Sequence, residues 1–208
     1  MAWPNGERSA GARGVLGLLA AALLVGVASW VPVAGRQVPG WERSLFRAGN
    51  DLPGFLYVPV WVVMQLGSGV AIPVAAGVAL AFRCVRLAVG LAIAGEGASI
   101  LASVFKSVVG RARPAALLPH VHVRGGVVAG NGYPSGHAAV AFALATSVAL
   151  CVGSRWRWVP VVAAAVVGFA RVYVGAHFPL DVVGGAALGA VCGAIVALVL
   201  RRGHSVAG

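Results

Sequence analysis

Six long apolar runs separated by short polar segments dominate this chain and limit the folds that it can adopt. The runs cover residues 14–34, 57–81, 87–109, 136–153, 159–176 and 180–200. Each is close to the roughly 20 apolar residues that an α-helix needs to cross a bilayer. None alternates polar and apolar residues, as the strands of a membrane barrel do. We therefore expect an all-α fold, a bundle of six transmembrane helices that forms a single domain over residues 1–208.

The charge content supports a membrane protein and argues against a nucleic-acid partner. Only 10% of the residues are charged, whereas soluble domains carry about 25%. The net charge of +11 comes from basic residues that are spread along the loops rather than clustered. Anionic lipid headgroups and a phosphorylated substrate explain this charge better than a nucleic acid does. Cys84, Cys151 and Cys192 lie in or beside apolar runs and form no C-x-x-C pair, so we expect no disulfide framework.

The distribution of cationic residues predicts the orientation in the membrane. With the N-terminus inside, eight cationic residues fall on each side; omitting Lys106, Arg113 and Arg171 as site residues leaves eight inside against five outside. The positive-inside rule then places both termini in the cytoplasm. The first run also resembles a signal peptide, but it is longer than the usual apolar region of one. The segment Trp41–Ala48 mixes aromatic and charged residues and is expected to form a short helix on the outer interface, which anchors the surface or serves lipid entry.

Two features inside the apolar runs concern helix packing. Gly185, Gly189 and Gly193 recur at intervals of four, a spacing that lets helices approach closely. We expect them to pack inside the bundle, with a dimer seam as the alternative; the oligomeric state stays open. Glu96 stands alone in the third run, and acids within a membrane usually face the bundle interior. It either pairs with a cation of the site or stays neutral and hydrogen-bonded.

Three polar segments carry the chemistry of the chain. They are Lys106-x6-Arg113-Pro114, Pro134-Ser135-Gly136-His137 and Arg171-x5-His177-x3-Asp181. In a six-helix topology all three lie on the same side of the membrane, at the ends of the third, fourth, fifth and sixth helices. Lys106 is the only lysine among sixteen cationic residues, which suggests that a compact ammonium is needed at that point.

This set of groups suits a phosphoryl group. Catalysis of phosphoryl transfer is mostly positioning and electrostatic stabilisation of negative oxygens. Arg113 and Arg171 can each bind two oxygens with a planar guanidinium, and Lys106 adds a point charge. Ser135 and Gly136, at a helix start, can direct backbone N–H groups at an anion.

A histidine is the expected nucleophile. His177 is followed four residues later by Asp181, and a carboxylate on one ring nitrogen leaves the other free to attack phosphorus. Ser135 is the competing candidate, but its own segment offers no base at a fixed spacing. His137 is then available to protonate the leaving oxygen and later to activate water.

A metal-dependent mechanism is the main rival. Magnesium sites need carboxylates, and the chain has only Glu7, Glu42, Asp51, Glu96 and Asp181, of which Glu42 and Asp51 lie far from the motifs in sequence. His120-x-His122 could contact zinc, although histidines in loops seldom do. We predict a site without a metal or another cofactor.

The three segments resemble the type 2 phosphatidic acid phosphatase (PAP2) superfamily, whose pattern is K-x6-R-P, P-S-G-H and S-R-x5-H-x3-D. This chain reads KSVVGRARP at 106–114, PSGH at 134–137 and ARVYVGAHFPLD at 170–181. The resemblance implies a phosphohistidine at His177 with Asp181 behind it and His137 as acid. It places Lys106, Arg113, Ser135, Gly136 and Arg171 on the phosphate. Ala170 departs from the family serine, which bears on rate or substrate preference more than on reaction class.

The resemblance implies a multi-pass lipid phosphatase of the cell membrane whose active site faces away from the cytoplasm. A polyprenyl diphosphate of the undecaprenyl type is the expected substrate, with phosphatidate or phosphatidylglycerol phosphate as alternatives. Transfer of the phosphoryl group to another lipid is a second possible reaction. A protein that only binds or flips a lipid headgroup would need the cations but not the histidine pair. A haloperoxidase is disfavoured because those relatives are soluble.

Overall fold

Every element of the computed structural model is helical in the part of the chain that it describes, residues 11–35, 37–126, 129–152 and 155–202. Arg8 and Arg36, which contributed to the charge count, lie outside these residues. The elements are α1 (Ala12–Ala34), α2 (Gly40–Asn50), η1 (Gly54–Leu56), α3 (Tyr57–Met64), η2 (Gln65–Gly67), α4 (Ala71–Ala81), α5 (Val85–Val109), α6 (Pro114–Leu117), α7 (Gly136–Ala149), α8 (Trp158–Tyr173) and α9 (Pro179–Arg202).

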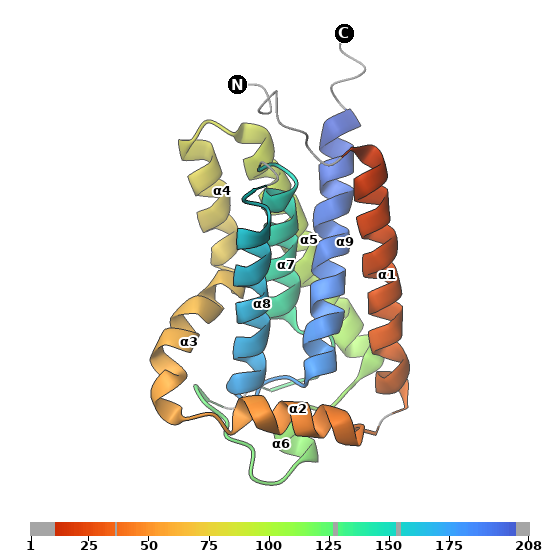
Figure 1. Ribbon diagram of the computed structural model, residues 1–208, viewed down its shortest axis with the longest axis vertical. Coiled ribbons are helices and arrows are strands. Elements are labelled where there is room, and N and C mark those ends of the chain that lie inside the picture. The colour runs from red at the N-terminus through yellow and green to blue at the C-terminus, as the bar shows by residue number, and fades with distance from the viewer. Residues whose placement is uncertain (1–10, 36, 127–128, 153–154, 203–208) are drawn as a thin grey trace.

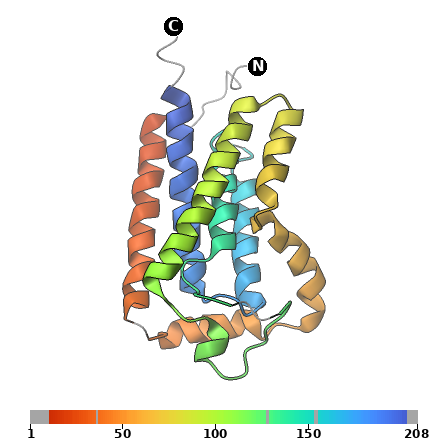
Figure 2. The ribbon, with the colours of Figure 1, turned by 180° about the vertical axis from the view of Figure 1, so that it is seen from behind.

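The long helices form an upright bundle around α7, and α2 lies across one end of it (Figure 1). Helix α7 packs against α5, α8 and α9, while α1 covers α9, α4 covers α5 and α3 covers α8. Helix α1 begins and α9 ends at the bundle end opposite α2. Seen from behind, α4 and α5 stand side by side while α3 leans away from the bundle (Figure 2). Successive long helices therefore alternate in direction, which brings the three motifs to the α2 end.

The all-α expectation is confirmed, but a continuous helix over 57–81 is wrong. The chain breaks after α3, and the segments Gly54–Gly67 and Ala71–Ala81 meet at a bend of 69°. The break coincides with Gly67-Ser68-Gly69, and a Cβ on Gly67 would lie only 2.5 Å from the carbonyl oxygen of His137. Glycine is therefore needed where this segment touches the start of α7.

The number of membrane crossings is a separate matter from the helix count. Three described helices are long and apolar enough to span a bilayer, and the bent pair adds a fourth if it counts as one span. Helices α7 and α8 have 14 and 16 residues, which is shorter than a full crossing. The six-span arrangement with both termini inside thus stays a prediction.

The glycines of α9 pack inside the bundle, as expected. A Cβ on Gly185 would collide with the carbonyl oxygen of Ser135, and one on Gly189 with that of Ala139. Gly193 lies against Ala143 in the same way. Backbone contact along three turns joins α9 to α7, the two helices whose first turns carry parts of the motifs.

Helix α2 is amphipathic, which confirms the short surface helix expected at Trp41–Ala48. Trp41 and Leu45 are exposed, whereas Phe46 is fully buried and packs on Phe178 with ring centroids 5.3 Å apart. The helix ends at Asn50, whose side chain donates to the carbonyl oxygens of His122 and Tyr173 and accepts from the His122 N–H. These contacts hold α2 and the loop after α6 onto the end of α8.

Glu96 does not face the interior of the bundle. Its side chain is exposed on α5, so the expectation of an interior position is wrong, and so is the alternative in which Glu96 pairs with a cation of the site.

Candidate active site

All eight residues that the motifs predict for the site lie at the α2 end of the bundle. They occupy the last turns of α5 and α8, the first turns of α7 and α9, and the adjoining loops. The residues are Lys106, Arg113, Ser135, Gly136, His137, Arg171, His177 and Asp181.

His177 and Asp181 are held by the turn between α8 and α9. Gly175 has a φ of +77°, and a Cβ there would meet the carbonyl oxygen of His122 at 2.7 Å, so the turn requires glycine. Pro179 begins α9, and the Oδ2 of Asp181 in its first turn accepts from the Phe178 N–H at 2.9 Å. The same oxygen lies 3.5 Å from His177 Nδ1, a long contact that leaves this buried nitrogen without a closer acceptor.

The other ring nitrogen of His177 faces the cationic part of the site. Its Nε2 lies 3.4 Å from Arg113 Nη1, and the same Arg113 nitrogen donates to the Ala176 carbonyl oxygen at 2.8 Å. The imidazole is only 2% exposed. Burial lowers the pKa of His177 to about 4; Asp181 opposes this shift, and the charges of Arg171 and Arg113 add to it. The imidazole is therefore neutral at pH 7, which is the form that can act as a nucleophile.

Arg171 and Lys106 complete the cationic side. Arg171 is buried near the end of α8; its Nη1 lies 3.0 Å from the sulfur of Met64, and its Nε has no hydrogen-bond partner among the described residues. A buried guanidinium N–H without an acceptor is costly, and an anion would satisfy it. A Cβ on Gly136 would lie 3.5 Å from Lys106 Nζ, so the ammonium group sits beside the start of α7.

The first turn of α7 brings His137 beside these cations. Lys106, Arg113, Arg171 and His177 are all near enough for their charges to act on the His137 imidazole. Ser135 caps the helix: its Oγ lies 3.5 Å from the Ala138 N–H, and its own N–H donates to the Asp181 carbonyl oxygen at 2.8 Å. The two histidines thus share one site.

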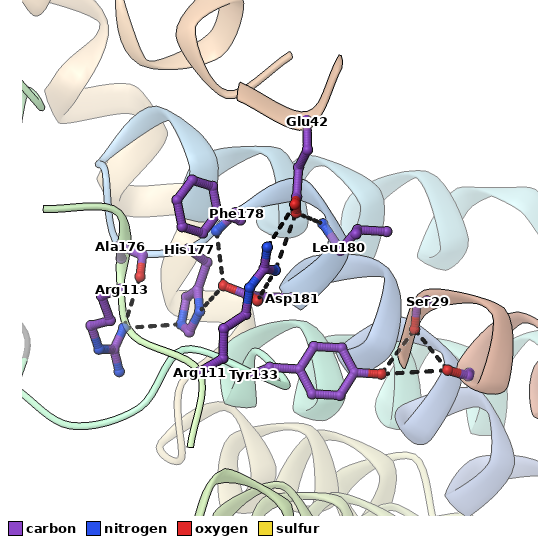
Figure 3. Close-up of polar contacts among 11 residues, drawn as sticks. Ser29, Glu42, Arg111, Arg113, Tyr133, Ala176, His177, Phe178, Leu180 and Asp181 are labelled. Atoms are coloured by element: carbon purple, nitrogen blue, oxygen red, sulfur yellow. Dashed lines mark hydrogen bonds and ion pairs between the residues drawn. The ribbon is translucent and has the colours of Figure 1, made fainter. Parts of the chain in front are cut away.

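Two buried charged residues of this region were not predicted. Arg111 Nη1 donates to Asp181 Oδ1 at 2.7 Å, and its Nη2 donates to Glu42 Oε2 at 2.6 Å (Figure 3). The distance of Glu42 from the motifs in sequence argues against a place in the site, and Arg111 is not one of the fixed residues of the motif pattern. Arg111 lies two residues before Arg113, inside the first motif. A guanidinium buried at that position needs a carboxylate partner, so the motif segment itself indicated that a further acidic residue belongs to this region.

Ala170 and the loop histidines stand apart from this chemistry. Ala170 is fully buried in an apolar cluster with Met64 and Tyr173. His122 lies 3.8 Å from Asp51, with both side chains exposed. In the described part of the chain, no three His, Cys, Asp or Glu side chains gather as a metal-ligand group.

Comparison with known protein families supports the resemblance that the three motifs indicate. The family model of the PAP2 superfamily matches residues 74–204. An undecaprenyl-diphosphatase of Sulfolobus acidocaldarius is 33% identical over 160 residues, which are 76% of this chain and 77% of that protein. A lipid A 1-phosphatase of Rhizobium johnstonii is 36% identical over half of this chain but only 43% of its own length.

Two crystal structures have the same fold. Aquifex aeolicus LpxE matches 74% of this chain and 93% of its own, with a TM-score of 0.69 and 30% identity. A phosphatidylglycerolphosphate phosphatase of the PAP2 type from Bacillus subtilis covers 90% of this chain and 96% of its own. Its TM-score is 0.70, and at 19% identity it supports the fold alone.

Proposed function

Because the chain belongs to the PAP2 superfamily and is a membrane phosphatase, we propose that it hydrolyses a polyprenyl diphosphate on the extracytoplasmic face of the cell membrane through a phosphohistidine at His177. The observation that carries this proposal is the arrangement of His177. One ring nitrogen faces Asp181, and the other faces Arg113. The undecaprenyl-diphosphatase that matches 76% of this chain supports the substrate class.

In the first step, His177 Nε2 attacks the terminal phosphorus. A proton on Nδ1, directed at Asp181, leaves Nε2 with its lone pair free. Arg113, Arg171 and Lys106 bind the phosphoryl oxygens, on which negative charge accumulates. The bond between the terminal phosphorus and the bridging oxygen breaks, and this oxygen takes a proton from His137, whose protonated form is stabilised by the negative charge of the bound diphosphate. The products are the lipid monophosphate and a phosphorylated His177.

In the second step, water replaces the histidine. His137, now neutral, removes a proton from water, which attacks the phosphorus, and the P–N bond breaks. Inorganic phosphate leaves, and His177 and His137 return to their starting forms. No metal ion takes part in either step of this scheme.

An apolar groove beside the site suits the hydrocarbon chain of such a substrate. The groove has a volume of about 340 Å³ and runs between α1, α5 and α9. Its lining includes Tyr133 and Pro134, which directly precede Ser135, and Phe105, which directly precedes Lys106. The phosphate site and the groove therefore adjoin along two segments of the chain. A larger apolar cavity of about 660 Å³ lies between α4, α5, α7 and α8 and has no lining residue from the site.

The test is phosphate release by purified protein from four substrates: a polyprenyl diphosphate, phosphatidate, phosphatidylglycerol phosphate and a soluble phosphoester. We expect the diphosphate to give the highest kcat/KM. A clear preference for another lipid would contradict the substrate but not the reaction. Release of free phosphate without an acceptor lipid would exclude an obligate phosphotransferase.

The His177→Ala variant tests the mechanism. We expect turnover to fall by about 10³-fold or more, because the proposed phosphohistidine cannot form without this imidazole, while the bound lipid is retained. Orthovanadate should inhibit the natural protein, since it mimics five-coordinate phosphorus, and EDTA should not. Full turnover by the variant would rule out His177 as the nucleophile.

A further inference from the structure

A chain of alternating buried charges runs from α2 to the catalytic histidine. Glu42 is fully buried, Arg111 is 8% exposed and Asp181 is fully buried. Arg111 lies between the two carboxylates and contacts both, and His177 follows Asp181 (Figure 3). Buried charges are tolerated only when they are paired and hydrogen-bonded, and here each member supplies the next one with its partner.

Both terminal nitrogens of Arg111 are bound to carboxylates. Its Nη1 reaches Glu42 Oε1 at 3.1 Å as well as Asp181, and its guanidinium carbon lies 4.8 Å from the centre of the Phe178 ring. Arg111 therefore differs from Arg113, whose Nη1 points at His177. Arg111 supports Asp181, whereas Arg113 lies beside the ring nitrogen of His177 that is proposed to attack the phosphate.

Glu42 extends this support to the backbone of α9. Its Oε1 accepts the N–H of Leu180 at 3.0 Å, one residue before Asp181. A side chain of the surface helix α2 thus fixes the first turn of α9 directly and, through Arg111, the catalytic carboxylate.

We infer that Glu42 and Arg111 are positioning residues of the reaction, which fix Asp181 and set how strongly its charge acts on His177. This inference rests on the proposed role of His177 as nucleophile. Arg111 partly neutralises Asp181, and Glu42 partly neutralises Arg111. Helix α2 is in this way a component of the active site rather than only a surface anchor.

The two residues should shift the pH profile in opposite directions. The charged groups that act on His177 are Asp181 from α9, Arg171 from α8, Arg113 from the loop and, when protonated, His137 from α7. Without Arg111, Asp181 would stabilise a proton on His177 more strongly and raise the pKa of His177. Without Glu42, Arg111 would neutralise Asp181 more fully and lower this pKa.

The experiment compares Arg111→Gln, Arg111→Lys and Glu42→Gln, with farnesyl diphosphate in detergent as substrate. Arg43→Gln is the matched control, because this arginine is the exposed neighbour of Glu42 on α2. For Arg111→Gln we expect kcat to fall by roughly 10²-fold with KM nearly unchanged, and the acid limb of kcat/KM to move up by about 0.5–1 pH unit. Glu42→Gln should move this limb down, Arg111→Lys should recover part of kcat, and Arg43→Gln should change neither.

A folding defect is separated from a positioning defect by the double variant Glu42→Gln/Arg111→Gln. This variant removes one buried charge of each sign and keeps hydrogen-bonding side chains. We expect it to fold and to move the acid limb in the direction of Arg111→Gln, because Arg111 is the direct neighbour of Asp181. Unshifted acid limbs in folded variants would overturn the inference while leaving His177 as nucleophile, whereas an active His177→Ala would overturn the proposed function itself.

Discussion

At the scale of single residues, the proposed role of His177 makes activity depend on the neutral form of its imidazole. As the nucleophile of that mechanism, His177 must lose its second ring proton before attack, and burial lowers the pKa of His177 to about 4. We therefore expect protonation of His177 to leave kcat/KM unchanged between pH 7 and about 5. Below about pH 4, kcat/KM should fall tenfold for each pH unit. The His137→Ala variant should be slower but keep this acid limb. An acid limb near pH 6.5 would show that His177 is not shielded in this way.

The same shift makes the folded protein less stable in acid. The unfolded chain takes up a proton on His177 near pH 6.5, whereas the folded chain resists it until about pH 4. The unfolded state thus binds more protons in this window, so stability falls as the pH drops from 6.5 to 4. Melting temperatures in detergent should fall over this range, and the fall should be smaller in His177→Gln, which cannot titrate.

Residue spacing was sufficient to predict that His177, Asp181 and Arg113 belong to one site but not which buried charges contact Asp181. The motifs named His177, Asp181 and Arg113 because a fixed chemistry requires them at fixed intervals. Glu42 has no such interval to the motifs, since it reaches Arg111 only through the position of α2 across the bundle end. Tertiary packing created this contact.

At the scale of elements, the contact between α7 and α9 is the tightest of the bundle. In Gly189→Ala, the added methyl group would collide with the Ala139 carbonyl oxygen, and overpacking of this kind costs about 1–3 kcal/mol. Gly17→Ala is the matched control, because nothing lies within 4 Å of a Cβ on this exposed residue of α1. We expect a lower melting temperature for the first variant and an equal or higher one for the second. Equal melting temperatures would contradict the close approach.

The break between α3 and α4 shows that average hydropathy does not locate a helix break within an apolar run. The run 57–81 is apolar throughout, so its average predicts one helix. Glycine and serine at 67–69 interrupt it, and small residues of this kind commonly end helices. The bend itself follows from the contact of Gly67 with α7, which no local pattern contains.

At the scale of the whole molecule, the groove between α1, α5 and α9 predicts a dependence on chain length. Val27 and Val108 are exposed residues on opposite walls of the groove. Changing both to Trp should raise KM for a long polyprenyl diphosphate several-fold and leave a soluble phosphoester unaffected. Val78→Trp, in the larger apolar cavity, is the control and should have no effect. The reverse result would place the hydrocarbon chain in the larger cavity.

Maleimide labelling of a native cysteine, Cys84, tests the proposed orientation in the membrane. Cys84 is exposed on the turn between α4 and α5, at the bundle end opposite the site. If the site faces away from the cytoplasm, a membrane-impermeant maleimide should label Cys84 in inverted vesicles but not in intact cells. In a Cys84→Ser background, Ser44→Cys on the exposed side of α2 should show the opposite pattern. Labelling of Cys84 in intact cells would reverse the orientation.

The direct backbone contact of α7 with α9 also bears on how the enzyme tolerates different bilayers. His137 lies in the first turn of one of these helices, and His177 lies two residues before the other, so the close packing of this central pair fixes their spacing. Helix α4, which follows the joint and packs mainly on α5, can adjust its tilt to a thicker or thinner hydrocarbon layer. Turnover should accordingly change little across liposomes of different acyl length, because α4 rather than the α7–α9 pair absorbs the hydrophobic mismatch.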